Sequence, residues 1–135
     1  MQGTRFFRFL GTVLIILFAS WAGFGCQPAG EKQSNINLSW EVEPDPPRVG
    51  MSTVTVFLKD STRRPVEDAR VTLEGNMSHP GMQPVISQAT ETEPGRYSAK
   101  MEFTMAGDWF ILITSTLKDS TIAEHQIELP GVRPE

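Results

Sequence analysis

Apolar and polar residues alternate with a period of two along most of the chain after residue 35. The even-numbered positions are apolar in residues 38–42, and they are apolar again in residues 54–58. This spacing places the apolar side chains of an extended segment on one face, as in a half-buried β-strand. The proline-rich segment 44–47 separates the two runs. Each run is therefore predicted to be a strand with one buried side.

The same pattern recurs to the end of the chain. Further strands are predicted at 69–73, 85–92, 97–103, 109–116 and 121–129, with polar, glycine or proline-containing turns between them. The segment 109–116 is apolar on both faces, which predicts a central strand. About seven short strands with turns at regular spacing are typical of a sandwich. We therefore expect an all-β fold, an immunoglobulin-like antiparallel β-sandwich.

The first 25 residues have a different pattern. Arg5 and Arg8 precede an apolar run over residues 9–24, and Cys26 follows directly. A basic start, an apolar run and a cysteine are typical of a bacterial secretion signal that ends at a lipidation site. The alternative is an uncleaved anchor helix, although the run is short against the roughly 20 apolar residues of a spanning helix. Either interpretation places the remainder outside the cytoplasm, on the periplasmic face in a cell with two membranes.

These boundaries divide the chain into a lipoprotein signal peptide with its N-terminal helix (1–25), a polar flexible tether (26–35) and one domain (36–131). The formal net charge is −4, and removal of the leader makes the mature chain more acidic. An acidic domain does not favour a nucleic-acid partner. Because Cys26 is the sole cysteine, the expected monomer has no intrachain disulfide. The expected partners are the membrane, through the lipid anchor, and a copper protein or other envelope protein.

Methionine and histidine gather at one end of the predicted sandwich. If the strands run alternately up and down, the connections after the first, third and fifth strands share an end. Those connections bring together Met51, Met77, His79, Met82 and Met105. The connections at the opposite end carry charged and polar residues that are typical of solvated turns.

Thioether sulfur and imidazole nitrogen are ligands that suit Cu(I). The segment 77–82 offers sulfur, nitrogen and sulfur donors within one loop, and Met105 is expected at the same end. Because these donors are neutral, they favour Cu(I) over Zn(II) and over hard cations. The sequence therefore predicts a Cu(I) site formed by Met77, His79, Met82 and Met105, with residues 77–82 exposed.

Structural explanations compete with this interpretation. Methionine is also a flexible core filler, and Met101 and Met105 continue the buried positions of strand 97–103, which favours core packing for both. Met51 could plug the end of the sandwich. His125 shares its strand face with apolar residues and is expected to be a partly buried structural histidine. The acidic pairs lie on predicted surfaces with no nucleophile and base nearby, so no enzymatic activity is expected.

Several segments together resemble the YtkA-like domain family. They are Trp40–Gly50, Pro65–Val71, Met77–Met82, Gly95–Tyr97 and Phe103–Trp109. The resemblance implies a small extracytoplasmic immunoglobulin-like module, related to the FixH-like group that is linked to copper-oxidase assembly. It also implies metal handling by the methionine-rich loops. Gly107 and Trp109 are interpreted as structural, a glycine with positive φ and a core anchor.

The sequence thus predicts a lipid-anchored extracytoplasmic protein that binds Cu(I) weakly or transiently as an accessory or chaperone. The alternative is a structural or protein-interaction module without metal. In that case the methionine-rich end docks a partner as an adaptable apolar surface.

Overall fold

The computed structural model describes residues 35–79 and 81–134. Within that part, no helix has the length and apolar character needed to cross a membrane. The predicted signal helix, the lipidation site Cys26 and the tether up to residue 34 lie outside the described residues. They stay predictions.

Seven strands follow one another along the chain. They are β1 (Asn37–Glu43), β2 (Gly50–Lys59), β3 (Arg70–Met77), β4 (Val85–Glu93), β5 (Arg96–Phe103), β6 (Gly107–Thr116) and β7 (Ile122–Val132). Each predicted strand is present, which confirms the all-β fold. The largest differences from the predicted bounds are the start of β2 at Gly50 and the ends of β3 at Met77 and β7 at Val132.

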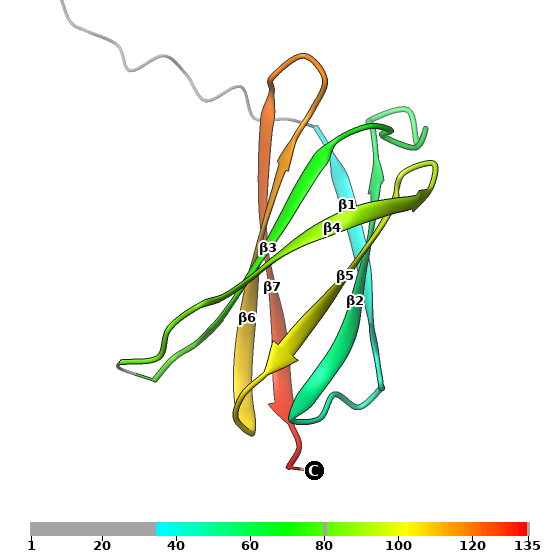
Figure 1. Ribbon diagram of the computed structural model, residues 1–135. Coiled ribbons are helices and arrows are strands. Elements are labelled where there is room, and N and C mark those ends of the chain that lie inside the picture. Colours follow the sequence, from blue (N-terminus) through cyan, green and yellow to red (C-terminus); the bar gives the residue numbers. More distant parts are fainter. Residues whose placement is uncertain (1–34, 80, 135) are drawn as a thin grey trace, which may run out of the picture. The chain divides into compact units, whose positions relative to one another are not determined.

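The strands are ordered β1-β2-β5-β4-β3-β6-β7, and every neighbouring pair is antiparallel. Strands β1, β2, β5 and β4 form one sheet, and β3, β6 and β7 form the other. This is the strand grouping of a constant-type immunoglobulin domain. Because β4 pairs with both β5 and β3, it joins the two sheets, and Figure 1 shows it crossing between them. Strand β6 lies between β3 and β7, as its apolar character predicted.

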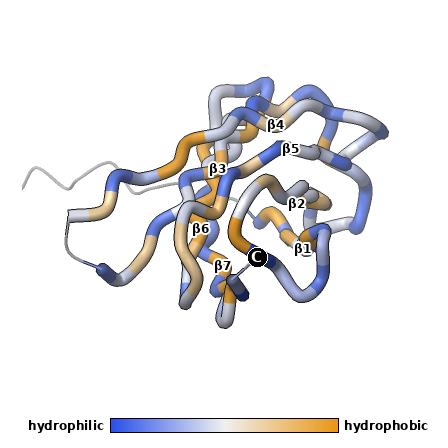
Figure 2. Tube along the Cα trace, turned by 60° about the horizontal axis from the view of Figure 1, so that its bottom comes forward, coloured by the Kyte–Doolittle hydropathy of each residue, from blue (hydrophilic) through white to orange (hydrophobic). Residues whose placement is uncertain are grey.

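The core lies between the inner faces of the two sheets. It contains the predicted alternating positions of β2 and β5, and Trp109 is the largest fully buried side chain. In Figure 2 the most hydrophobic parts of the tube lie mainly along the strands, and the hydrophilic parts are concentrated in several of the connections. The Tyr97 hydroxyl donates to the Val66 carbonyl (2.8 Å) and accepts from the Ala69 N–H (3.0 Å). Burial raises the pKa of Tyr97, so the neutral phenol holds the β2–β3 connection against β5.

Hydrogen bonds also link the β1–β2 connection to Arg133, the residue that follows β7. The Val49 N–H donates to the Arg133 carbonyl (2.8 Å), and the Arg133 N–H donates to the Pro47 carbonyl (2.9 Å). Farther along β7, His125 Nε2 lies 3.1 Å from the Ile36 carbonyl oxygen. The half-buried His125 thus has a structural contact, as the sequence predicted.

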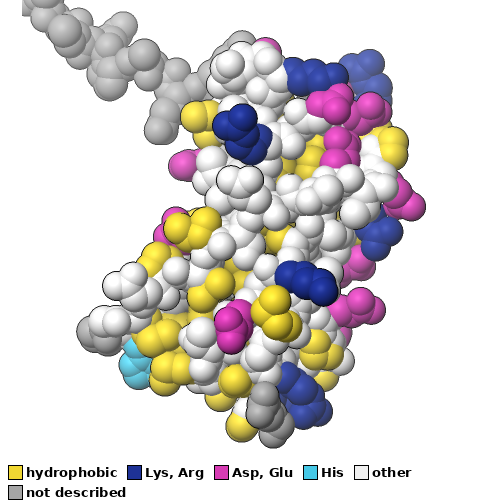
Figure 3. All heavy atoms as spheres, viewed as in Figure 1, with side chains coloured by type: hydrophobic (Ala, Val, Ile, Leu, Met, Phe, Trp, Pro, Cys, Tyr) yellow, Lys and Arg dark blue, Asp and Glu magenta, His cyan; other side chains and the backbone are white. Residues whose placement is uncertain are grey.

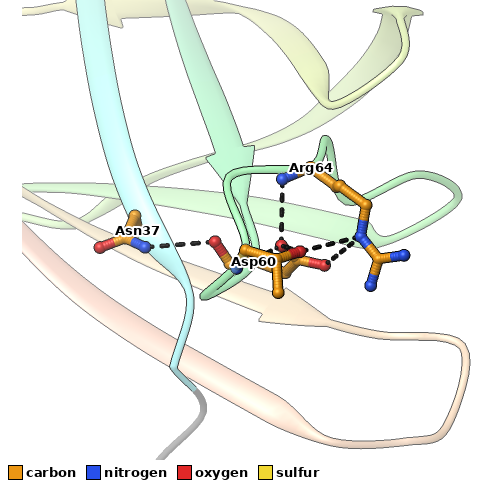
Figure 4. A network of polar contacts seen from close by, with 4 residues as sticks. Asn37, Asp60 and Arg64 are labelled. Atoms are coloured by element: carbon orange, nitrogen blue, oxygen red, sulfur yellow. Dashed lines mark hydrogen bonds and ion pairs between the residues drawn. The ribbon is translucent and has the colours of Figure 1, made fainter.

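The β2–β3 turn is organised around the Asp60 carboxylate (Figure 4). Its Oδ1 accepts from the Thr62 hydroxyl (2.6 Å), the Thr62 N–H (2.8 Å) and the Arg64 N–H (3.0 Å), and its Oδ2 accepts from Arg64 Nε (3.2 Å). The Thr62 hydroxyl is the main reason that the pKa of Asp60 falls to about 2, and the Arg64 N–H is the next cause. Asn37 Nδ2 also donates to the Asp60 carbonyl (3.3 Å), which ties the turn to β1.

Asp60→Asn is expected to lower the melting temperature at neutral pH, and this decrease should become smaller in acid. A carboxyl whose native pKa lies below its usual 3.8 stabilises the fold above about pH 4. That stabilisation is lost as the pH falls toward about 2. Thermal melts of both proteins between pH 7 and pH 2 should show the difference shrinking in acid. Glu102→Gln, which removes an exposed carboxylate of β5, serves as the control. If the melting temperatures of Asp60→Asn and the wild type differ by the same amount at pH 7 and at pH 2, this account is contradicted.

Candidate functional site

One end of the domain, here called the methionine end, is defined by Met51, Met77, His79, Met82 and Met105. The strand register pairs Gly50 with Phe103 and Met77 with Trp109. The connections after β1, β3 and β5 therefore lie at the same end of the sandwich, at the bottom of the view in Figure 1. The predicted gathering of these connections is confirmed.

Met77 is the last residue of β3 and not part of an exposed loop. Its side chain is only 9% exposed and belongs to the core cluster. The expectation that it is exposed was wrong. The inward positions of β3 run through Gly75, where an added Cβ would lie 2.9 Å from Met101 Sδ. The Met101 side chain thus fills the inward position that the glycine leaves empty, and the alternation continues to Met77.

Met105 lies on the turn between β5 and β6, and its side chain is 45% exposed. The core-packing expectation for Met105 was therefore wrong. The turn is fixed by Trp109, whose Nε1–H donates to the Met105 carbonyl (3.0 Å). Gly107 has the predicted positive φ, at 130°, and a Cβ there would lie 3.1 Å from the Met77 methyl carbon. The turn that carries Met105 thus packs directly on Met77.

The connection between β3 and β4 carries the other two predicted donors. His79 is exposed, as expected, whereas Met82 is half-buried and packs against the core cluster. In Figure 3 a histidine side chain lies beside hydrophobic side chains at the lower left of the domain, where Figure 1 shows this connection. The structure thus combines an accessible imidazole with a partly accessible thioether on one short segment.

The two other methionines of the domain, Met101 and Met51, differ in burial. Met101 is fully buried, which confirms its core role. Met51 is the second residue of β2 and is 63% exposed, so it does not plug the end of the sandwich. It pairs with Glu102 on β5, the strand that leads into the turn that carries Met105.

The chemistry available at the methionine end is that of soft, neutral donors. Three methionines and one histidine come from the end of β3, the β3–β4 connection and the β5–β6 turn. Residues 35–79 and 81–134 contain no group of three or more His, Asp or Glu side chains arranged to hold a metal ion. Thioether sulfur and imidazole favour Cu(I). The arrangement offers donors on one fixed turn and on one longer connection.

At the opposite end, Glu91 has a structural role that sequence reasoning missed. Its Oε2 accepts from the Asp68 N–H (2.9 Å), and its Oε1 accepts from the Gly95 N–H (3.0 Å). The carboxylate therefore joins the β2–β3 and β4–β5 connections. Asp68 also pairs with Lys118 Nζ at 2.6 Å, so three connections meet at this end. Nothing in the local sequence around Glu91 indicates the contact with Asp68, because Asp68 lies 23 residues away along the chain.

A comparison with models of protein families identifies the family of this chain. The model of the YtkA-like family matches residues 31–114, which is more than half of the chain. The chain belongs to the YtkA-like family. The resemblance seen in the sequence is thereby confirmed, and the matched region runs from just before β1 into β6.

Two other comparisons add little to this assignment. No curated protein matches the chain. Among solved structures, the soluble domain of PmoD from a Methylocystis species is similar at 15% identity with a TM-score of 0.46. The similarity covers 73% of this chain and 91% of that chain.

Proposed function

We propose that this YtkA-like protein is a lipid-anchored, extracytoplasmic accessory protein that binds Cu(I) weakly or transiently at the methionine end. The proposal gives it no catalytic activity. The observation that carries it is the exposed Met105, on a turn that Trp109 fixes, at the same end as the exposed His79. Exposed thioether and accessible imidazole at one end of the domain are the kinds of donor that suit Cu(I).

The four proposed ligands differ in how they would contribute. Met105 and His79 are accessible, and Met82 is half-buried. Met77 is almost fully buried, with its methyl group against Gly107. A bound ion would therefore reach the Met77 sulfur from the interior side of the β5–β6 turn. A site with two accessible donors and two less accessible donors favours weak or transient binding, because the ion can enter and leave through the exposed pair.

The proposal is tested by anaerobic titration of the purified protein with Cu(I) in competition with a chelator of known affinity. We expect measurable Cu(I) binding and no binding of Zn(II) at the same concentrations, because neutral sulfur donors select the softer ion. Failure to compete for Cu(I) under reducing conditions would overturn the proposal.

A second candidate function is docking of a protein partner by the methionine end without metal. The observation that favours it is the exposure of two large apolar side chains, Met51 and Met105, at this end. Methionine forms adaptable apolar surfaces that tolerate different partners. A protein that binds no Cu(I), and whose Met51 and Met105 become protected when a partner is added, would favour this function.

Cys26→Ser is expected to abolish lipid attachment. The basic leader and the cysteine directly after its apolar run are typical of a lipoprotein signal. Without the thiol the protein should stay unprocessed or be released from the membrane fraction. Fractionation with mass spectrometry of the mature N-terminus checks this. A Cys26→Ser protein that is processed and membrane-bound as before, with no lipid on the wild type, would show that the leader is not a lipoprotein signal.

A further inference from the structure

Strand β6 has a second apolar face that the core does not use. Its inward side chains, among them Trp109, Ile111 and Ile113, are buried. Phe110 and Leu112 alternate with them and lie on the outer surface of the sheet, where Leu112 is 37% exposed. The sequence predicted that β6 is apolar on both faces, and the described residues cover only one of them.

Neighbouring strands extend this outer face. The register places Ile86, Glu74, Leu112 and Gln126 in one row across β4, β3, β6 and β7. Ile86 is 64% exposed. A hollow of about 350 Å³, lined in part by Glu74, Leu112, Glu124 and Gln126, opens on the same strands. We call this surface the β6 face, defined by Ile86, Glu74, Phe110, Leu112, Glu124 and Gln126.

Most of the charges around the β6 face are negative, and the one cation on the outer side of β3, Arg70, lies two rows from Glu74, opposite Thr116. Glu74 and Glu124 lie on it, and Glu128 pairs with Phe110 in the next row. None of the three carboxylates forms an ion pair with a Lys or Arg among the described residues. Asn76 Nδ2 donates a hydrogen bond to Glu74 Oε1 (3.1 Å), and Gln126 Nε2 donates one to Glu128 Oε1 (2.7 Å). The face thus combines exposed aliphatic side chains with oriented carboxylates that lack cationic partners.

We propose that the β6 face docks a segment of a partner protein that carries aliphatic side chains flanked by Lys or Arg. The aliphatic side chains would cover Leu112 and Ile86, and the cations would meet Glu74 and Glu124. Complementary charge of this kind selects partners and orients them. This surface is separate from the methionine end, and the inference does not depend on copper binding.

Two other occupants fit the charges less well. Anionic lipid headgroups attract basic segments, so an acidic face would be repelled by a membrane surface. A second copy of the chain would bring two surfaces with an excess of carboxylates together, and like charges that face each other are destabilising. A cationic protein segment is the occupant that both the apolar and the acidic side chains favour.

Site-specific photocrosslinking of the full lipid-anchored chain in intact cells tests the proposal. A benzophenone side chain is placed at Leu112, and the control site is Ser39, an exposed residue of β1 in the other sheet and outside the methionine end. We expect a protein adduct from Leu112 only, and sequencing of the crosslinked segment should show aliphatic residues beside Lys or Arg. Ile86 is the second site, which keeps the test valid if the Leu112 variant folds poorly.

A charge series completes the experiment. Glu74→Gln with Glu124→Gln should reduce the adduct yield by about tenfold, equivalent to roughly 1.4 kcal/mol. Glu41→Gln with Glu102→Gln, on the other sheet, should leave the yield unchanged. The proposal is overturned by the absence of an adduct at both Leu112 and Ile86, by an adduct with a second copy or with lipid, or by an equal adduct at Ser39. A yield that does not respond to the Glu74 and Glu124 changes would also overturn it.

Discussion

Replacing Trp109 with alanine is expected to lower the free energy of unfolding by about 3 to 5 kcal/mol, the usual cost of truncating a large buried aromatic side chain. Trp109 is 2% exposed, and its ring meets the ring of Phe103 edge to face at a centroid distance of 5.2 Å. Domains of this kind are typically stable by only about 5 to 15 kcal/mol. Urea or thermal unfolding of the two proteins would measure the loss.

Two further variants separate the causes of that loss. Trp109→Phe keeps an aromatic ring but removes the Nε1–H that donates to the Met105 carbonyl, so we expect a smaller cost, about 1 to 3 kcal/mol. Phe110→Ala removes a half-buried ring from the outer face of the same strand and should cost less than Trp109→Ala. If Trp109→Ala melts within a degree or two of the wild type, Trp109 does not anchor the core.

The fold could be predicted from the sequence because one face of each strand is buried against the opposite sheet. In β2 and β5 the apolar positions alternate without interruption, and the structure buries those positions. Since a shift of one residue would expose the entire apolar set, the pattern also determines which face points inward. The antiparallel order then follows from short connections between consecutive strands.

The ends of the strands were less predictable, and the errors at the candidate site arise there. Gly75 has no side chain to mark an inward position, so β3 was expected to end before Met77. The alternation of β5 extends to Phe103, but the backbone turns immediately afterwards. Period-two counting holds only while the chain is extended, so the inward position predicted for Met105 was wrong.

Contacts between distant segments were beyond reach for a different reason. The Gly107 contact with Met77 and the bond between Glu91 and Asp68 join residues that are far apart in the sequence, so they are determined by three-dimensional packing. The residue types alone identified Trp109 and Gly107 as structural. The contact of Gly107 with Met77 could be found only once the register of β3 and β6 was known.

The double variant His79→Ala with Met82→Leu is expected to remove most of the Cu(I) affinity while leaving the melting curve nearly unchanged. His79 is exposed, and leucine preserves most of the volume of the half-buried Met82; such volume-conserving changes usually cost less than about 1.5 kcal/mol. The affinity is measured by anaerobic competition with a Cu(I) chelator, and circular dichroism checks the fold. Met51→Leu is the matched control, because it removes an exposed thioether of β2 that is not a proposed ligand, and its affinity should equal that of the wild type.

Acid provides an independent check on the role of the imidazole. Histidine takes up a proton in mildly acidic solution, and a protonated ring nitrogen cannot bind a metal, whereas thioether sulfur does not titrate. Cu(I) binding by the wild type should therefore weaken as the pH falls, and His79→Ala should bind more weakly at neutral pH but lose this dependence. Met105→Leu should bind more weakly at every pH and keep the dependence. If the double variant retains the wild-type affinity, or if His79→Ala weakens in acid as the wild type does, the ligands lie elsewhere and the docking function of the methionine end becomes the better account.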